Sequence, residues 1–498
     1  MCGIVGAIAQ REVVPILLEG LKRLEYRGYD SAGVAVVNGE ACLERVRSAG
    51  KVTALEELVG ASRLRGTTGI AHTRWATHGA PSEHNAHPHV CYGAVAVVHN
   101  GIIENYQALR AQQEQAGFVF TSETDTEVIA HQIYHHLAVT GDLLEAVRAA
   151  VRDLHGAFAL GVISRDEPGR MVAARRGSPL VLGVGIGERF IASDIAALLP
   201  VTQRFLILEE GDIADIGRDS VRIFDRDDRP VERAERVSEL RADAVERGEY
   251  RHYMLKEIFE QPRAIADTLV DRLGGERVLD EAFGPRAGEL LSATRNVHIV
   301  ACGTSYHAGL VARYWIEAFA GIPCSVEVAS EYRYRRPVVP PGTLFVTLSQ
   351  SGETADTLAA LREAKTLGYL GTLGICNVPE SSLVRESDLV LMTRAGPEIG
   401  VASTKAFTTQ LVALMLLTLA VGRQQGMDAG RHRRLLEQVK RVPTQIEGVL
   451  RLNDTIAELS HELADKQHAL FLGRGAQYPV AMEGALKLKE ISYIHAEA

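Results

Sequence analysis

The second residue of the chain, Cys2, has the chemistry of a nucleophile. Removal of Met1, which a small second residue permits, would leave Cys2 with both a thiol and a free α-amine. An α-amine has an ordinary pKa of about 7.7–8.0 and can accept a proton at neutral pH. One residue would then supply nucleophile and base together. A lone cysteine at this position is more often just a small residue at a strand start, so Cys2 needs partners elsewhere.

Suitable partners follow two apolar runs further along the chain. Arg74 lies in the segment His-Thr-Arg-Trp-Ala-Thr-His-Gly at 72–79, and Asn100 and Gly101 close the next run. Loops at strand ends commonly carry functional side chains. The planar guanidinium of Arg74 can hold a carboxylate, while the Asn100 amide and the Gly101 N–H can donate to an oxyanion. Together with Cys2, these residues predict a site that cleaves an amide.

Two other polar clusters have simpler interpretations. Residues 124–127 (Thr-Asp-Thr-Glu) precede a stretch of helical periodicity, where Thr124 or Asp125 would cap the helix. Three histidines have the spacing of a zinc site. Because Pro and Asn residues among them favour a loop, and no cysteine or carboxylate completes a compact set, we predict a loop there. These histidines are His84, His87 and His89.

Residues 349–354 (Ser-Gln-Ser-Gly-Glu-Thr) follow the apolar run 344–348 and precede a helical stretch. Hydroxyl groups, a glycine that permits close approach and a helix N-terminus can bind an anion without Lys or Arg. An ordinary N-cap with spare serines explains the pattern equally well. The similar turn 302–305 also follows an apolar run, and both turns should open on one edge of a parallel sheet. The pair favours an anion site, such as one for a phosphate group.

A lysine near the end of the chain is placed between two glutamates. On a helix, Lys487 shares a face with Glu483 and Glu490, whereas Lys489 points elsewhere. Most such pairs are solvated and worth only about 0.2–0.5 kcal/mol. Taken alone, the pattern therefore predicts an exposed helix face.

The elements that would position these groups differ between the two halves of the chain. Up to about residue 217, short β-branched runs such as 33–37 and 94–98 alternate with Gly, Asn and Asp turns, and 13–24 and 126–137 have helical periodicity. This half predicts an α+β domain dominated by sheet. Beyond about residue 290, apolar runs alternate with helical stretches, which predicts an α/β domain with a parallel sheet.

Composition sets the class of protein. The 498 residues can form several cores, and 46% apolar and 23% charged residues exclude a disordered or fibrous chain. The formal charge of −9 is the wrong sign for gripping nucleic acid. Six cysteines without Cys-x-x-Cys spacing fit a reducing compartment. The start of the chain lacks a signal-peptide pattern, and the longest apolar run, 411–421, is too short to span a membrane. We expect a cytoplasmic protein with no nucleic-acid or membrane partner.

The motifs together resemble a known family. In chain order they are CGIVG, LEYRGYDSAG, HTRWATHG, NAHPH, HNGIIEN and SETDTE. This part resembles the class II glutamine amidotransferase domain, an α+β N-terminal nucleophile fold. The rest resembles the α/β, flavodoxin-like sugar-isomerase (SIS) part of the glutamine–fructose-6-phosphate aminotransferase family. The implied domains are an amidotransferase domain at 2–218, a charged linker at 219–250, a first SIS domain with its leading helices at 251–440, and the truncated start of a second SIS domain at 441–498.

The resemblance implies a role for each residue of the glutamine site. Cys2 attacks the side-chain amide of glutamine, and Asn100 and Gly101 hold the oxyanion. Arg74 binds the α-carboxylate and Asp125 the α-ammonium group. The other implied glutamine-site residues are Trp75, Thr77, His78 and His87.

The resemblance also implies a second, sugar-binding site. Lys487 forms a Schiff base with the open-chain sugar, and Glu490 moves a proton between adjacent sugar carbons, with Glu483 behind them. The residues implied to bind the sugar phosphate are Thr304, Ser305, Ser349, Gln350, Ser351, Thr354, Val401 and Ser403.

The implied reaction transfers the amide nitrogen of L-glutamine to D-fructose 6-phosphate with isomerisation, giving D-glucosamine 6-phosphate and L-glutamate. Ammonia passes between the sites sheltered from water, because bulk solvent would protonate it. The resemblance implies no cofactor, no metal and a homodimer. Family members continue beyond HAEA with a ring-opening His and a tail Lys, so we expect residues 2–498 to hydrolyse glutamine but to make little amino sugar.

Three alternatives stay open at this point. A glutaminase-only fragment would use the Cys2 site alone. An amidotransferase that feeds a phosphoribosyl substrate would need a phosphoribosyltransferase loop in place of residues 349–354. A non-enzymatic sugar-phosphate-binding protein would keep residues 349–354 but would lack the set formed by Cys2 and Arg74.

Overall fold

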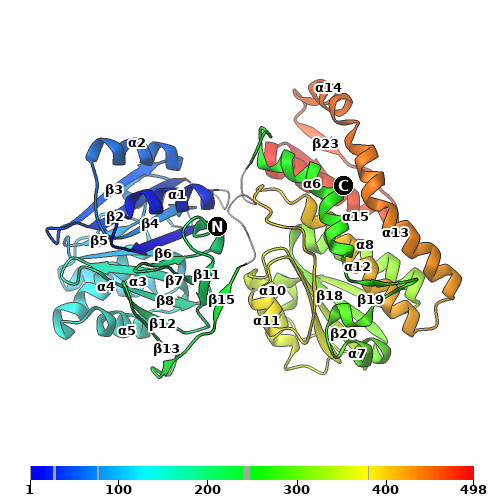
Figure 1. Ribbon diagram of the computed structural model, residues 1–498, viewed down its shortest axis with the longest axis horizontal. Helices are drawn as coiled ribbons and strands as arrows, with labels where there is room; N and C mark the ends of the chain where they lie inside the picture. The colour runs from blue at the N-terminus through cyan, green and yellow to red at the C-terminus, as the bar shows by residue number, and fades with distance from the viewer. Residues whose placement is uncertain (1, 26–29, 76–77, 239–246, 380) are drawn as a thin grey trace. The chain divides into compact units, whose positions relative to one another are not determined.

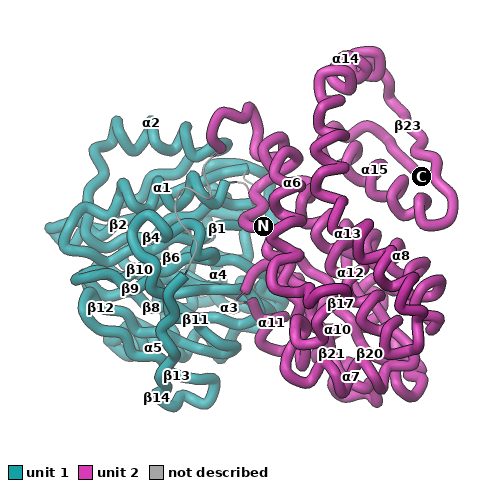
Figure 2. The backbone as a smooth tube through the Cα atoms, turned by 45° about the vertical axis from the view of Figure 1, so that its right-hand side comes forward, with its two compact units in different colours: residues 1–246 teal, residues 247–498 magenta. Residues whose placement is uncertain are grey.

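The computed structural model describes the whole chain except residues 1, 26–29, 76–77, 239–246 and 380. The chain divides into two compact units, residues 1–246 and 247–498 (Figure 2). Each unit has hydrophobic clusters of its own.

Unit 1 (residues 1–246) contains two sheets whose described strand pairs are all antiparallel. The first sheet has, in spatial order, β15 (Glu235–Val237), β11 (Arg204–Ile207), β9 (Val181–Val184), β10 (Arg189–Ala192), β1 (Gly3–Ile8), β4 (Thr68–Arg74), β2 (Ser31–Val37) and β3 (Leu43–Ala49). The second sheet has β14 (Pro230–Val231), β13 (Val221–Phe224), β12 (Ile213–Gly217), β8 (Arg170–Arg176), β7 (Gly156–Ser164), β6 (Val95–Ile103) and β5 (His89–Cys91).

The two sheets of unit 1 pack face to face, and helices cover their outer faces (Figure 1). Ile4 and Ile70 from the first sheet meet Val98 and Ile163 from the second in one fully buried cluster. Because both faces are covered, β1 is a continuous apolar run rather than an alternating one. The helices and short 3-10 turns are α1 (Val14–Leu24), α2 (Val52–Ser62), η2 (Glu83–Asn85), α3 (Tyr106–Gln115), α4 (Asp125–Thr140), α5 (Leu143–Asp153) and η3 (Ile195–Ala197).

The charged stretch 219–250 is not a linker throughout, so that prediction is wrong for its first part. Strands β13 and β14 extend the second sheet, and β15 extends the first. Edge strands can pair through their backbone while charged side chains face water, so a high charge density does not exclude them. The first unit therefore continues well past residue 218.

Unit 2 (residues 247–498) is built on a five-stranded parallel sheet, as the sequence predicts. Its spatial order is β19 (Cys324–Val328), β18 (Asn296–Ala301), β20 (Thr343–Ser349), β21 (Gly371–Cys376) and β22 (Leu389–Met392). In chain order this is 2-1-3-4-5, the flavodoxin-like arrangement. Its switch point lies between β18 and β20, the two strands that precede the predicted phosphate turns.

Helices cover both faces of this sheet. The described helices of unit 2 are α6 (Tyr253–Leu269), α7 (Ala287–Ala293), α8 (Gly303–Trp315), α9 (Ala329–Tyr332), α10 (Ala355–Ala364), α11 (Ser382–Glu386), α12 (Lys405–Gln424), α13 (Ala429–Leu450), α14 (Asn453–Leu463) and α15 (Gln477–Ser492). The short elements are β16 (Leu273–Gly274), β17 (Arg277–Val278), η5 (Asp280–Phe283), η6 (Ile316–Ala320), β23 (His468–Leu470) and β24 (His495–Glu497). Helix α13 runs unbroken through the predicted boundary at residue 440, whereas β23 and β24 form a separate parallel pair joined through α15.

Helix α12 is, among the described helices, the one whose length and composition would allow it to cross a membrane. Its most apolar window is 78% buried within the structure. Leu414 and Leu417 of this helix belong to the main hydrophobic cluster of unit 2. Such burial is that of a core helix.

Candidate active sites

In unit 1, Cys2 lies where the two sheets approach each other. Pairing of β1 with β4 sets Gly3 opposite Thr73 and so places Cys2 beside Trp75, whose N–H donates to the Cys2 sulfur at 3.2 Å. From the second sheet, Asn100 Nδ2 donates to the Cys2 carbonyl at 3.0 Å. The structure therefore brings the predicted nucleophile and the predicted oxyanion donor together.

The Cys2 thiol is held in its protonated form. Burial raises the pKa of Cys2, and donation from the Trp75 N–H only partly offsets this effect. The nearby imidazoles are neutral, because burial lowers the pKa of His72 to about 3 and also lowers the pKa of His87 and His99. Activation of the thiol therefore needs a base other than these histidines.

The orientation of the Asn100 amide is set by His72, a residue that the sequence predictions missed. His72 Nε2 lies 2.9 Å from Asn100 Oδ1, and since that oxygen is an acceptor, Nε2 must carry the proton. The NH₂ group of Asn100 then faces Cys2. His72 stacks on His87, with ring centroids 4.2 Å apart. A signal existed in the sequence, because His72 precedes Arg74 by two residues and strand alternation puts both on one face.

The second predicted oxyanion donor is the backbone N–H of Gly101, a position where no other residue type fits. Gly101 has φ +138°, and a Cβ there would lie 2.0 Å from the carbonyl oxygen of Ala157. The absence of a side chain at Gly101 allows β6 and β7 to approach closely beside Asn100.

Arg74 is buried and braces the loop that follows it. Its guanidinium donates to the carbonyl oxygens of His78, Gly79 at 3.2 Å and Ala80 at 3.3 Å, and lies 3.5 Å from the carboxylate of Asp30. The predicted contact of Arg74 with glutamine must therefore share a guanidinium that already holds this loop.

The other predicted glutamine-site residues have different surroundings. Trp75 is half exposed, and the His78 ring packs edge-on against Tyr106. His87 is buried behind His72 rather than open to a ligand. Thr77 lies outside the described residues.

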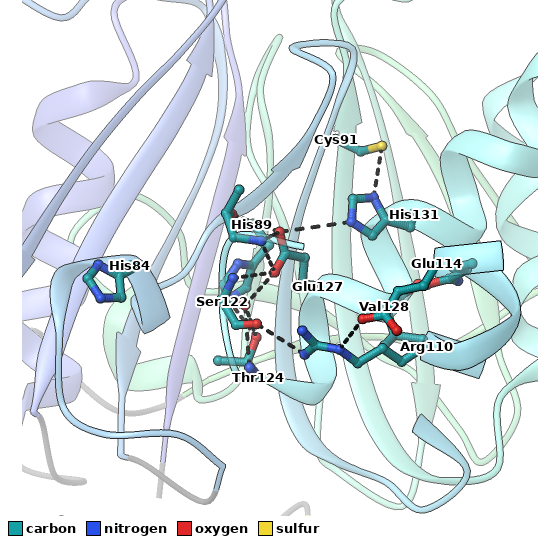
Figure 3. Close-up of polar contacts among 12 residues, drawn as sticks. His84, His89, Cys91, Arg110, Glu114, Ser122, Thr124, Glu127, Val128 and His131 are labelled. Atoms are coloured by element: carbon teal, nitrogen blue, oxygen red, sulfur yellow. Dashed lines mark hydrogen bonds and ion pairs between the residues drawn. The ribbon is translucent and has the colours of Figure 1, made fainter. Parts of the chain in front are cut away.

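The start of α4 departs from the predicted capping. Thr124 occupies the N-cap position but forms no side-chain cap, and its hydroxyl instead meets His89 Nε2 at 2.9 Å (Figure 3). Asp125, the first helical residue, accepts from the Ile103 N–H at 2.9 Å. Glu127 reaches back to accept from the backbone N–H of Ser122, which precedes the helix, at 2.6 Å (Figure 3). These contacts fix Asp125 at the end of β6.

The histidine cluster is not arranged as a metal site. His89 is bonded to Thr124, while His84 lies apart on the short turn η2 (Figure 3). Within the described parts of the chain, no group of three or more His, Cys, Asp or Glu residues is placed to hold a metal ion.

In unit 2, the two predicted phosphate turns follow the adjacent strands β18 and β20 at the switch point of the sheet. Ser349 Oγ accepts from the Gly352 N–H at 2.9 Å and lies 3.0 Å from Thr354 Oγ1. Ser305, at the start of α8, accepts from Gln410 of α12 at 3.0 Å. The hydroxyl groups are thus pre-positioned at two helix N-termini.

Gly352 allows this turn to pack closely. It has φ +67°, and a Cβ there would lie 2.0 Å from Ser381 Oγ. The predicted residues Val401 and Ser403 lie on a separate loop between β22 and α12, where Val401 is exposed and Ser403 donates to Glu398 at 2.8 Å.

Lys487 projects from α15 toward the first of these turns. Its Nζ lies 3.0 Å from Thr304 Oγ1, 2.7 Å from Glu490 Oε2 and 3.3 Å from Glu483 Oε1. The helical spacing predicted both glutamate contacts, and Lys489 is exposed. The lysine and its carboxylates therefore lie beside the predicted phosphate turn that contains Thr304.

Glu483 has a further partner that the sequence predictions missed. Its Oε2 lies 2.7 Å from Nδ1 of His307, and its Oε1 accepts from Thr304 at 2.8 Å. Burial alone would raise the pKa of Glu483, but His307, Lys487 and Thr304 outweigh it and lower that pKa below its usual value. The available signal was that His307 follows Thr304 by three residues, the spacing of one helix face.

Family models match both units. Residues 72–200 match a glutamine amidotransferase domain, and residues 290–420 and 462–498 match a SIS domain. A glutamine–fructose-6-phosphate aminotransferase (isomerizing) from Pseudomonas syringae pv. tomato is 63% identical, covering 100% of this chain and 82% of the relative. The one from Idiomarina loihiensis is 59% identical with the same coverage. The solved C-terminal domain of glucosamine-fructose-6-phosphate aminotransferase from Francisella tularensis matches with a TM-score of 0.50 and 55% identity, over 50% of this chain and 70% of that chain.

The fold and the two sites define an enzyme that joins a glutamine amidotransferase domain to a SIS domain. The coverage and identity of the relatives identify it further. The chain belongs to the glutamine–fructose-6-phosphate aminotransferase (isomerizing) family. The comparisons support this assignment and not a glutaminase-only or non-enzymatic protein.

Proposed function

We propose that the chain transfers the amide nitrogen of L-glutamine to D-fructose 6-phosphate with isomerisation, giving D-glucosamine 6-phosphate and L-glutamate. The glutamine half is shared by many amidotransferases, so the second site carries the assignment. The decisive observation is that Lys487, flanked by Glu490 and Thr304, lies at the edge where the hydroxyl-rich turns end. An amine at a sugar-phosphate edge is suited to imine formation with a ketose.

In the glutaminase half, Cys2 becomes the first residue after removal of Met1, and its α-amine takes the thiol proton. The thiolate attacks the glutamine amide carbon. The developing oxyanion is stabilised by Asn100 Nδ2 and the Gly101 N–H, and His72 supports this role by fixing the Asn100 amide. Ammonia leaves as the thioester forms, and water then releases glutamate.

The remaining residues of this site bind glutamine. Arg74 pairs with its α-carboxylate while continuing to brace the 78–80 loop, and Asp125 accepts from its α-ammonium group. Trp75 covers the site from its exposed position. The other glutamine-binding residues are Thr77, His78 and, through His72, His87.

In the sugar half, the phosphate binds at the two turns, and the Lys487 amine condenses with the open-chain ketone. Ammonia adds to the iminium carbon and Lys487 leaves as its amine, so the new imine carries the nitrogen from glutamine. This imine draws electrons from the neighbouring carbon, and Glu490 moves the proton between the two carbons, which gives the open-chain form of D-glucosamine 6-phosphate. The phosphate-binding residues are Thr304, Ser305, Ser349, Gln350, Ser351 and Thr354, with Val401 and Ser403 alongside.

Ammonia released at Cys2 is used at the sugar site without reaching bulk water, where it would be protonated. We further propose a cytoplasmic homodimer. The metabolic enzymes among the relatives and the buried state of α12 support the location.

The proposal is tested with glutamine carrying an isotope label on its amide nitrogen. Labelled glucosamine 6-phosphate should form above the background of Lys487→Met. Lys487→Met should keep glutamate release, and the matched control Lys489→Met should keep both activities. Product formation by Lys487→Met at the wild-type rate would contradict the proposal.

A further inference from the structure

His307 and Glu483 form a buried pair beside Lys487. Both residues are at least nine-tenths buried, and their contact joins α8 to α15 at 2.7 Å. An ionised carboxylate is acceptor-only, so His307 Nδ1 must carry the proton that is shared with Glu483. The second oxygen of Glu483 accepts from Thr304, so both oxygens of this carboxylate have a donor.

An ionised carboxylate is costly to bury unless donors or opposite charges compensate it. For Glu483 the charged and titratable groups in contact are Lys487 on its own helix and His307 on α8, with Glu490 beyond Lys487. Lys487 is partly occupied by Glu490, which lies closer to it than Glu483 does. His307 is therefore a principal donor that Glu483 does not share with the second carboxylate.

The chemistry at Lys487 needs a constant negative charge nearby. An ammonium and a ketone condense to an iminium and one water, so the nitrogen carries one positive charge before and after the step. A carboxylate that stays ionised throughout matches that charge at both ends. If Glu483 took up a proton instead, the cation would keep only Glu490, whose own charge changes when it moves the proton.

We propose that His307 is a positioning residue that keeps Glu483 ionised and oriented as the counter-charge to the Lys487 nitrogen, as an ammonium and then as an iminium. The inference rests on the proposed imine at Lys487. It adds a residue that acts through Glu483 and touches neither the sugar nor the reacting atoms.

The test traps the imine with sodium borohydride in the full chain with fructose 6-phosphate, and measures the adduct on Lys487 by peptide mass spectrometry across pH 5.5 to 8.5. His307→Leu should slow trapping by about tenfold to hundredfold near pH 6, the scale for losing a hydrogen bond to a charged group. Its acid limb should move to higher pH. His307→Asn places an amide N–H close to the position of Nδ1, and it should restore most of the rate.

Further variants separate charge from packing. In a Glu483→Gln background, His307→Leu should have little further effect, because its target is gone. Trp315 fluorescence reports whether α8 is folded. If His307→Leu unfolds, His307→Asn and His307→Asp are compared instead, because their side chains have the same shape. Only His307→Asn can donate to Glu483. His307→Asp adds a like charge beside Glu483 and should lose trapping.

Two outcomes would overturn the inference alone. One is a folded His307→Leu whose pH profile superimposes on the wild-type profile. The other is His307→Asn failing as badly as His307→Leu or His307→Asp. No adduct in the wild-type protein would instead overturn the proposed imine, and this inference with it.

Discussion

The two sites handle charge in opposite ways. Around Cys2 the buried imidazoles are neutral, and the pKa of the nucleophile itself is raised. Around Lys487 the groups form ion pairs, with the lysine between two carboxylates. In a site of neutral groups, a base must remove the proton of the nucleophile before the nucleophile can react. In a site of paired ions, the charges are already present before the reaction.

The difference follows from how each fold presents its residues. In unit 1 the site forms between two antiparallel sheets, where His72 on one strand meets Asn100 on another in a dry interior. In unit 2 the site forms at the edge of a parallel sheet, where helix N-termini and paired ions support charge. Burial favours neutral groups in the first case, and paired ions are tolerated in the second.

Replacing Cys2 should have the largest effect, and it should affect the glutamine site alone. In Cys2→Ala, glutamate release should fall by at least about 10³-fold, because no other group replaces the sulfur. Borohydride trapping of fructose 6-phosphate on Lys487 should stay unchanged. Both activities are assayed on the same preparation, and retained glutaminase activity would refute the nucleophile.

Removing the oxyanion donor should have the next largest effect. Asn100→Ala should lower the glutaminase kcat by about 10²- to 10³-fold with a small change in KM, since the donor acts mainly in the transition state. Asn38→Ala, on the turn between β2 and β3, is the control. A loss confined to KM would instead assign Asn100 to substrate binding.

Removing the support of the amide should cost less. His72→Leu deletes a neutral hydrogen bond, which is worth roughly 0.5–1.5 kcal/mol, so kcat should fall about three- to tenfold. His84→Leu, an exposed residue nearby, should leave kcat unchanged. Equal values of kcat for His72→Leu and wild type would show that Asn100 is oriented without it.

The pH dependence of stability should differ between the units. His72 stays neutral when folded but protonates near pH 6.5 when unfolded, so unit 1 should lose stability as the pH falls below about 6.5, by up to about 1.4 kcal/mol per pH unit. In unit 2, burial raises the pKa of Glu257 to about 7, so its contribution falls as the pH rises from about 4.5 toward 7.

Urea unfolding at pH 7.5 and 5.5 measures this contrast. The chain has two tryptophans, so Trp315→Phe leaves the signal in unit 1 and Trp75→Phe leaves it in unit 2. In unit 1, His72→Asn should reduce the pH dependence, while the exposed His135→Asn should not. A pH dependence that survives His72→Asn in full would exclude His72 as a source.

The periodicity of the sequence predicted those contacts that form within a single helix or follow from the order of the strands. The contacts of Lys487 with Glu483 and Glu490 follow from helical spacing. The meeting of the two hydroxyl-rich turns follows from the few topologies open to a parallel sheet. The charged strands β13 to β15 were missed because edge pairing depends on a neighbour far away in the chain.

Contacts between distant elements were not predictable in the same way. His72 and Asn100 lie on different sheets, and His307 and Glu483 are 176 residues apart. Thr124 was expected to cap α4, but its hydroxyl bonds to His89, whose position depends on β5. Each of these side chains has a plausible local role, and only the tertiary structure decides between it and the distant one.

The most direct test of the account is the covalent state of the first residue in active enzyme. Mass spectrometry of the N-terminal peptide, after quenching during glutamine turnover, should find a chain that begins at Cys2 and carries a glutamyl thioester on its sulfur. Fully active enzyme that retains Met1, or a glutamyl group on any other residue, would contradict it.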